Sequence, residues 1–90
     1  MGEVAERISR KLHDGLAPVR LEVRDDSARH AGHEGAREGG ESHFEVRLVS
    51  ASFEGLSRLE RQRLVNTLLA EELAGPVHAL SLKLQAPSET

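Results

Sequence analysis

The chain has 90 residues, which is enough for one small domain. Hydrophobic residues make up 38% and charged residues 30% of the sequence, a balance typical of a globular rather than a disordered chain. The lack of cysteine excludes disulfides, thiolate nucleophiles and metal sites built from the chain's own thiolates, and the net charge of −3 argues against a general nucleic-acid coat protein.

The first part of the chain is expected to form a helix followed by a strand. Apolar residues recur at every fourth position from Val4 through Ile8 to Leu12, which predicts an amphipathic helix. We expect this helix to end at Gly15, where glycine can act as a C-cap. Apolar and charged residues then alternate over residues 19–24, which predicts a strand with one solvated face.

Residues 26–42 have a different composition from the rest of the chain. They contain no apolar residue larger than alanine, which predicts a long flexible loop. A second strand is expected over residues 43–50, with Phe44, Val46 and Leu48 on one face. We expect the two strands to pair as a wide hairpin across the loop.

A second long helix is predicted in the C-terminal half. Its start is marked by Ser57 and Glu60, which are spaced as a capping box in which each side chain accepts from a free backbone N–H. We expect this helix to run to about Leu73 and to stop at Gly75-Pro76, because proline cannot donate to the next turn.

The remaining residues complete the predicted fold. Apolar residues alternate again from His78 to Leu84, which predicts a final strand with His78 at its start. Residues 86–90 are expected to form a frayed tail. The order α-β-β-α-β predicts a single α+β domain over residues 1–90, with a three-stranded sheet covered by helices on one face.

No segment of the sequence resembles a membrane anchor or a targeting signal. The N-terminal residues contain no apolar stretch of the kind found in signal peptides. No run of residues approaches the ~20 apolar positions that are needed to span a bilayer. We therefore expect a cytoplasmic protein that has no membrane partner.

His78 is the first candidate for a metal ligand. From the residues alone, such a histidine is more often a core residue whose ring nitrogens are satisfied by the backbone. Its place directly after Gly75-Pro76 supports a second interpretation. In this interpretation one ring nitrogen binds a metal while the other hydrogen-bonds within the domain.

Three further histidines lie in or beside the predicted loop, namely His30, His33 and His43. Close spacing of this kind can form a zinc or copper site. Solvated histidines without any partner are an equally good interpretation, because a surface loop acquires such residues readily. The spacing alone leaves both interpretations open.

A cluster of arginines forms a second candidate site. Arg58, Arg61 and Arg63 lie in the predicted second helix, and Arg47 lies in the second strand. Arginine binds phosphate in a bidentate manner, so this cluster predicts phosphate contact with a nucleic acid. The alternative is a solvated helix face with weak ion pairs.

No enzymatic signature is present in the sequence. It contains no Gly-x-Ser-x-Gly motif, no Walker loop and no dinucleotide-binding fingerprint. We therefore expect neither catalysis nor a small-molecule substrate.

Four motifs, taken together in their order along the chain, resemble the BolA-like family. They are Glu41-Ser-His43-Phe44, Phe53-Glu-Gly55-Leu56-Ser57, Glu60-Arg-Gln-Arg-Leu-Val65 and Ala74-Gly-Pro-Val-His78-Ala-Leu-Ser-Leu82. A weaker match continues upstream over residues 21–27 and 29–31. The resemblance therefore covers roughly four-fifths of the chain and implies a fold similar to the class II KH fold.

This resemblance implies a role in iron–sulfur chemistry. In the family, the histidine that corresponds to His78 ligates an iron–sulfur cluster in complexes with monothiol glutaredoxins. The second ligand is a histidine or cysteine of the loop, which corresponds to His30 here, with His33 as the alternative. His43 corresponds to a family motif position and is expected to support the site without ligating. The resemblance thus implies a [2Fe–2S] cluster shared with a glutaredoxin and its bound glutathione, and none in the isolated chain.

The resemblance also implies a possible DNA-binding role, because family members have been regarded as transcriptional regulators. Arg58, Arg61 and Arg63 would then contact phosphates. The chain has Gln62 where the family commonly has a histidine, so any role of that histidine is missing here. A Gly-x-x-Gly sequence at residues 32–35 lies between strands, whereas a KH clamp requires it between helices.

Overall fold

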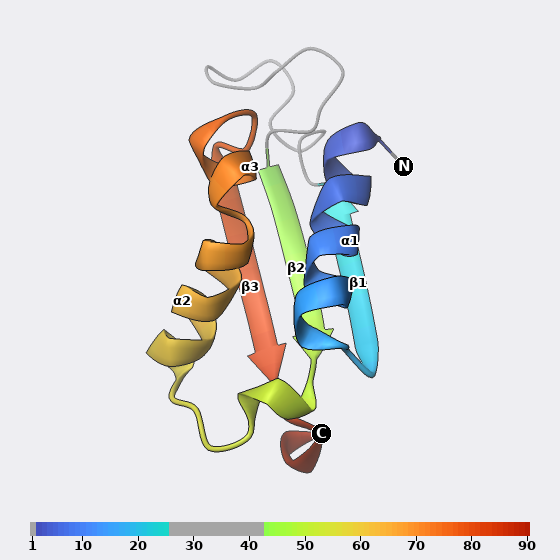
Figure 1. Ribbon diagram of the computed structural model, residues 1–90. Coiled ribbons are helices and arrows are strands. Elements are labelled where there is room, and N and C mark those ends of the chain that lie inside the picture. Colours follow the sequence, from blue (N-terminus) through green and yellow to red (C-terminus); the bar gives the residue numbers. More distant parts are fainter. Residues whose placement is uncertain (1, 26–42) are drawn as a thin grey trace.

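The computed structural model describes residues 2–25 and 43–90 (Figure 1). The predicted loop at residues 26–42, with His30 and His33, lies outside the described residues. The elements in chain order are α1 (Glu3–Leu16), β1 (Arg20–Asp25), β2 (His43–Val49), the 3-10 helix η2 (Ala51–Phe53), α2 (Arg58–Leu68), α3 (Ala70–Ala74), β3 (Ala79–Gln85) and the 3-10 helix η3 (Pro87–Glu89).

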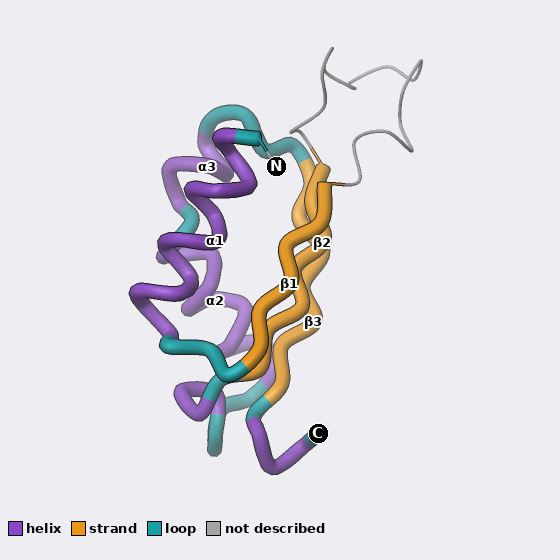
Figure 2. The backbone as a smooth tube through the Cα atoms, turned by 90° about the vertical axis from the view of Figure 1, so that its right-hand side faces the viewer, coloured by secondary structure: helices purple, strands orange, loops and turns teal. Residues whose placement is uncertain are grey.

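The strands form one three-stranded sheet in the order β1-β2-β3. β1 pairs with β2 in antiparallel fashion, from Arg20 opposite Val49 to Asp25 opposite Phe44, which confirms the predicted hairpin pairing. β3 runs parallel to β2 on its other side. The helices α1, α2 and α3 all lie on one face of this sheet, as predicted (Figure 2).

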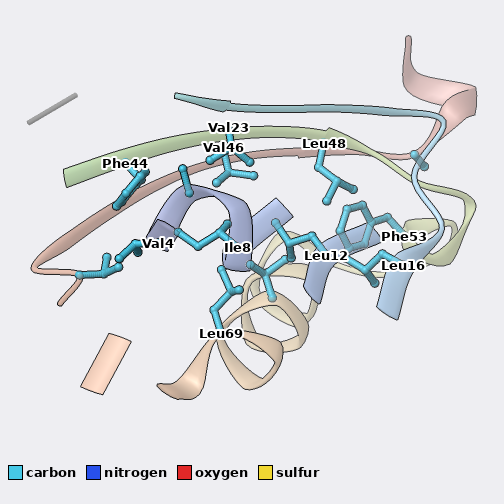
Figure 3. Packing of buried hydrophobic residues seen from close by; sticks show 14 residues of the cluster. Val4, Ile8, Leu12, Leu16, Val23, Phe44, Val46, Leu48, Phe53 and Leu69 are labelled. Carbon is cyan, nitrogen blue, oxygen red and sulfur yellow. The ribbon is translucent and has the colours of Figure 1, made fainter. Parts of the chain in front are cut away.

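The hydrophobic core fills the space between this face and the helices (Figure 3). α1 contributes residues spaced by four positions, as its sequence predicted, and β2 contributes alternate residues. The principal core residues are Val4, Ile8, Leu12 and Leu16 from α1, Phe44, Val46 and Leu48 from β2, and Val65 and Leu69 from the second half of the chain. The predicted alternation in β2 is confirmed, because these three residues all face the helices.

The end of α1 differs from the prediction, because Gly15 lies inside the helix and does not cap it. A Cβ atom at Gly15 would lie 2.9 Å from both methyl carbons of Leu68. Glycine therefore lets the Leu68 side chain pack directly on α1, and a larger residue would force that side chain to shift. The helix ends one residue later at Leu16, and Ala17 takes the left-handed conformation (φ 43°, ψ 57°) with its N–H bonded to the carbonyl of His13.

The second predicted helix begins as expected but is broken in two. The Ser57 hydroxyl accepts from the Glu60 N–H at 3.1 Å, and the Glu60 carboxylate accepts from the Ser57 N–H at 2.9 Å, which confirms the capping box. Leu69 then interrupts the helix with φ −103° and ψ 19°. The separate five-residue helix α3 follows, where one continuous helix to Leu73 was predicted.

The C-terminal residues do not form the predicted frayed tail. Pro87–Glu89 form a 3-10 helix, and Ala86 is fully buried. The Glu89 carboxylate accepts from the Ala86 N–H at 2.9 Å and binds the guanidinium of Arg61 at 2.6 and 2.7 Å. These contacts hold the segment against α2.

Candidate functional site

His78 lies at a corner between α3 and β3. α3 ends at Ala74, and Val77 returns to it by donating its N–H to the carbonyl of Glu72 at 3.0 Å. The Val77 side chain is buried in the core, whereas His78 directly after it is exposed. The imidazole is thus attached to a backbone segment that the packing of Val77 and its hydrogen bond to Glu72 hold in place.

His43 lies beside His78, although the two are far apart in the sequence. His43 is the first residue of β2, and the parallel register places it opposite Ala79, the first residue of β3. The two imidazole rings stack with their centroids 6.4 Å apart and their planes at 23°. The structure therefore brings together two of the histidines that the sequence singled out, at the edge of the sheet where β2 and β3 begin.

The two residues that flank segment 26–42 lie at this same edge. β1 ends at Asp25, which pairs with Phe44, the second residue of β2. The segment that carries His30 and His33 is consequently attached to the sheet beside His43 and His78. Within residues 2–25 and 43–90, no group of three or more histidine or acidic side chains could hold a metal ion.

Arg61 is engaged within the fold, which corrects its predicted role in phosphate contact. Its side chain is 11% exposed and binds the Glu89 carboxylate through both terminal nitrogens. It also donates to the carbonyls of Leu56 at 3.0 Å and Leu84 at 3.3 Å, and its guanidinium lies 5.8 Å from the Phe53 ring centre. Arg61 therefore ties the start of α2 to the end of β3 and to the C-terminal turn.

The charge state of Glu89 keeps this contact in place. The hydrogen bonds from Arg61 and then the N–H of Ala86 lower the pKa of Glu89 from its ordinary value of 4.5 to about 2. Of the predicted arginine cluster, Arg58 and Arg63 of α2 and Arg47 of β2 are exposed, and Arg47 is ion-paired with Glu45 at 2.8 Å. On the helix, the chemical capacity for phosphate contact therefore rests on Arg58 and Arg63 rather than on three arginines.

Glu72 is a buried charged residue that sequence reasoning missed. Its side chain is 0% exposed, and it is ion-paired with Arg7 and Lys11 of α1. A signal was present, because Glu72 continues the spacing of Val65 and Leu69 along the buried face of the helix. An acidic residue at such a position indicates a buried ion pair.

None of the described helices is both long enough and sufficiently apolar to cross a membrane. This finding applies to residues 2–25 and 43–90, which are the ones the structure describes.

Known proteins are similar to this chain in sequence and in fold. The sequence profile of BolA-like proteins matches residues 12–89. The chain belongs to the BolA-like family. Human BolA-like protein 1 is 47% identical over 89 residues, which cover 99% of this chain and 62% of the human protein. The solved BolA domain of SufE1 from Arabidopsis thaliana matches with a TM-score of 0.89 at 44% identity, covering 100% of this chain and 99% of that one.

A bacterial relative has a name that describes a function. The DNA-binding transcriptional regulator BolA of Escherichia coli (strain K12) is 48% identical over 79 residues, which cover 88% of this chain and 71% of that protein. These matches confirm the predicted α+β fold and the family resemblance. The similarity to the class II KH fold stays a prediction. The chain spans only 62% of the human protein's length, so the activity of such longer relatives carries over only as a proposal.

Proposed function

We propose that this chain binds a monothiol glutaredoxin and completes a shared [2Fe–2S] cluster through two histidines. His78 is the first ligand, and His30 or its alternative His33 is the second. The observation that carries this proposal is the exposure of His78 on a fixed corner, beside the attachment points of the segment that bears the other two histidines. A role in iron–sulfur trafficking or iron-linked regulation follows.

The absence of cysteine from the chain fits such a shared site. A [2Fe–2S] cluster takes four ligands, usually thiolates. The cysteine of a monothiol glutaredoxin and the thiolate of bound glutathione supply two, and two neutral imidazoles from this chain supply the others. Imidazole ligands raise the reduction potential relative to thiolates, and they are lost when the ring is protonated. These properties suit cluster transfer or sensing better than catalysis, and we infer no enzymatic activity.

His43 supports the site without ligating in this proposal. Its ring stacks on His78, and its backbone lies in β2, where the ladder to β3 holds it. Stacking limits the orientations that the His78 ring can adopt before a partner binds. The alternative, in which His43 itself ligates the cluster, is an outcome that the experiment below distinguishes.

The test is a titration of the chain into a glutathione-bound, cluster-loaded monothiol glutaredoxin, followed by visible absorbance and circular dichroism. We expect a new spectrum that saturates at one equivalent and is lost in His78→Ala. Separate His30→Ala, His33→Ala and His43→Ala variants identify the second ligand. His13→Ala is the matched control, because His13 is 74% exposed near the end of α1.

Three results would contradict the cluster proposal. An unchanged spectrum with a stable complex by size-exclusion chromatography would indicate an adaptor that docks the glutaredoxin without binding iron. An unchanged spectrum without a complex would exclude the glutaredoxin as a partner. A spectrum that persists in His78→Ala would assign the cluster to other ligands.

A second candidate function is DNA binding, which the name of the Escherichia coli relative supports. The exposed Arg58 and Arg63 would contact phosphates, whereas Arg61 is held by Glu89. The logarithm of the affinity should then fall linearly with that of the salt concentration, by roughly one unit of slope per phosphate contact. Arg58→Ala and Arg63→Ala should each reduce that slope by about one. A slope that neither substitution changes would exclude this face.

A cytoplasmic location is part of the same proposal, although it is independent of the site. Fractionation of cells that express the full-length protein would test it. Recovery in an organelle would overturn the location and leave the cluster chemistry unaffected.

A further inference from the structure

Glu72 is a fully buried carboxylate in the described part of the chain, and two partly exposed cations contact it. Its Oε2 lies 2.8 Å from Nη2 of Arg7, and its Oε1 lies 2.9 Å from Nζ of Lys11. Both cations belong to α1, whereas Glu72 belongs to α3. The ion pairs therefore connect two helices that are distant in the sequence.

The carboxylate is ionised at neutral pH despite its burial. Burial by itself raises the pKa of Glu72, but the hydrogen bond from Lys11 and the charges of Lys11 and Arg7 outweigh it, so that the pKa is lowered. Replacing a buried ion pair by apolar residues is often neutral or stabilising. A gain in stability alone thus gives little reason for a charge at this position. A better explanation is that the ion pairs fix how α3 is placed on α1.

The backbone of Glu72 holds the corner that precedes His78. Its carbonyl accepts from the N–H of Val77 at 3.0 Å and from the N–H of Gly75 at 3.3 Å. Val77 is 4% exposed, and His78 follows it directly. One residue therefore contacts α1 through its side chain and the histidine corner through its carbonyl.

α3 depends on such contacts for its position. It has only five residues, and a helix this short is not stable in isolation. The break at Leu69 separates it from α2, and the link between them is limited to backbone hydrogen bonds such as that from the Leu73 N–H to the Leu69 carbonyl at 3.0 Å. Tertiary contacts help to orient it: Lys11 donates a hydrogen bond to Oε1 of Glu72, and Arg7 lies within ion-pair distance of Oε2.

We propose that Glu72 is a positioning residue for His78. Its ion pairs with Arg7 and Lys11 fix α3 on α1, and its carbonyl transmits that position through Val77 to the imidazole, which stays stacked on His43. The purpose of this arrangement rests on the proposed cluster function. The positioning itself is measurable in the isolated chain, so the two can fail separately.

The experiment compares Glu72→Gln with Glu71→Gln in the complete chain. Glu71 is 79% exposed and lies 3.9 Å from Arg7 and 3.6 Å from Lys11, so its variant removes a nearby charge without a buried contact. The readouts are NMR cross-peaks of the His78 and His43 rings and hydrogen exchange of the Val77 amide. In Glu72→Gln we expect the ring signals to shift and the protection of Val77 to fall by about tenfold. Glu71→Gln should retain both.

Two further variants separate positioning from general instability. Phe53→Leu disturbs a fully buried core residue near Arg61 rather than the histidine corner, so it should leave the ring signals unchanged. Lys11→Gln removes one partner of Glu72 and leaves Arg7, which provides a milder test if Glu72→Gln does not fold. We expect Lys11→Gln to shift the ring signals in the same direction.

Native ring signals and native Val77 protection in Glu72→Gln would overturn the proposal. Equal changes in Phe53→Leu would also overturn it, because they would reflect global loosening. The failure of the cluster function has a different signature, because the wild-type chain would then give no new spectrum with the cluster-loaded glutaredoxin while these NMR differences remained.

Discussion

Ser50 connects the end of β2 to the end of α1 and provides a direct test of how the helix is attached to the sheet. Its side chain is fully buried. The hydroxyl donates to the carbonyl of Leu16 at 2.6 Å and accepts from the N–H of Ser52 at 3.1 Å. Ser50→Ala removes both hydrogen bonds and leaves the backbone unchanged.

The two lost bonds differ in cost. The Leu16 residue is only 3% exposed, so its carbonyl loses a partner in a dry environment, at a cost of about 1–3 kcal/mol. Ser52 is exposed, and water can replace the bond to its N–H, so the loss of that cap costs about 0.5 kcal/mol. We expect the free energy of unfolding to fall by about 2 kcal/mol, which corresponds to a Tm lower by about 10 °C.

The assay is urea denaturation followed by circular dichroism at pH 7. Ser52→Ala is the matched control, because it removes an exposed hydroxyl two residues away and should change stability by less than about 0.5 kcal/mol. A Ser50→Ala variant as stable as this control would refute the assignment of Ser50 as the link between α1 and β2.

Three other predictions concern stability. The pKa of Glu89 in the folded protein is about 2, below its ordinary value of 4.5. Its contribution to the free energy of unfolding is therefore present above pH 4.5 and lost as the pH falls toward 2. The urea midpoint of Glu89→Gln should be below that of the wild type at pH 7 and converge with it near pH 2. Ala17→Gly should raise the free energy of unfolding by about 0.5–1 kcal/mol in thermal melts, because alanine is strained at φ 43°; a lower Tm would contradict this. The effect of Gly15→Ala on the free energy of unfolding should be more favourable in a Leu68→Ala background than in wild type, because the new Cβ then avoids the Leu68 methyls at 2.9 Å. A double-mutant cycle additive within about 0.3 kcal/mol would exclude that contact.

Periodicity was enough to predict the main elements of this fold. The spacing of Val4, Ile8 and Leu12 placed α1, and the alternation around Phe44 placed β2 with the correct face inward. These patterns are local and follow directly from helix and strand geometry. The capping box at Ser57 is similarly local, and its two hydrogen bonds are present in the structure.

Several of the incorrect predictions depended on contacts between distant residues. Gly15 carries a standard C-cap signal, but the reason for glycine there is Leu68 on another helix. The C-terminal turn is ordered because Glu89 meets Arg61, a pairing that neither local sequence reveals. The same pairing removes Arg61 from the predicted phosphate-binding cluster. Charged residues that are spaced like a solvated face can therefore be structural when a distant partner exists.

The contact between His43 and His78 follows from the topology and was accessible from the sequence. Parallel strands need a long crossover, usually helical, whereas antiparallel neighbours can be joined by a tight turn. The helix predicted between the second and third strands therefore favours a parallel pair, in which both strands begin at the same edge of the sheet. A histidine at the start of each strand must then lie close to the other, as the ring separation of 6.4 Å shows.

The strand topology also explains why the end of the sheet where β2 and β3 begin suits the proposed shared cluster. Asp25, the last residue of β1, pairs with Phe44, so the antiparallel hairpin attaches segment 26–42 beside the two strand starts. An antiparallel β3 would instead have moved His78 to the opposite edge, beside Val49. Since the described residues provide only two neighbouring imidazoles and no group of three or more potential ligands, any iron bound here must take its remaining ligands from that segment or from a partner protein.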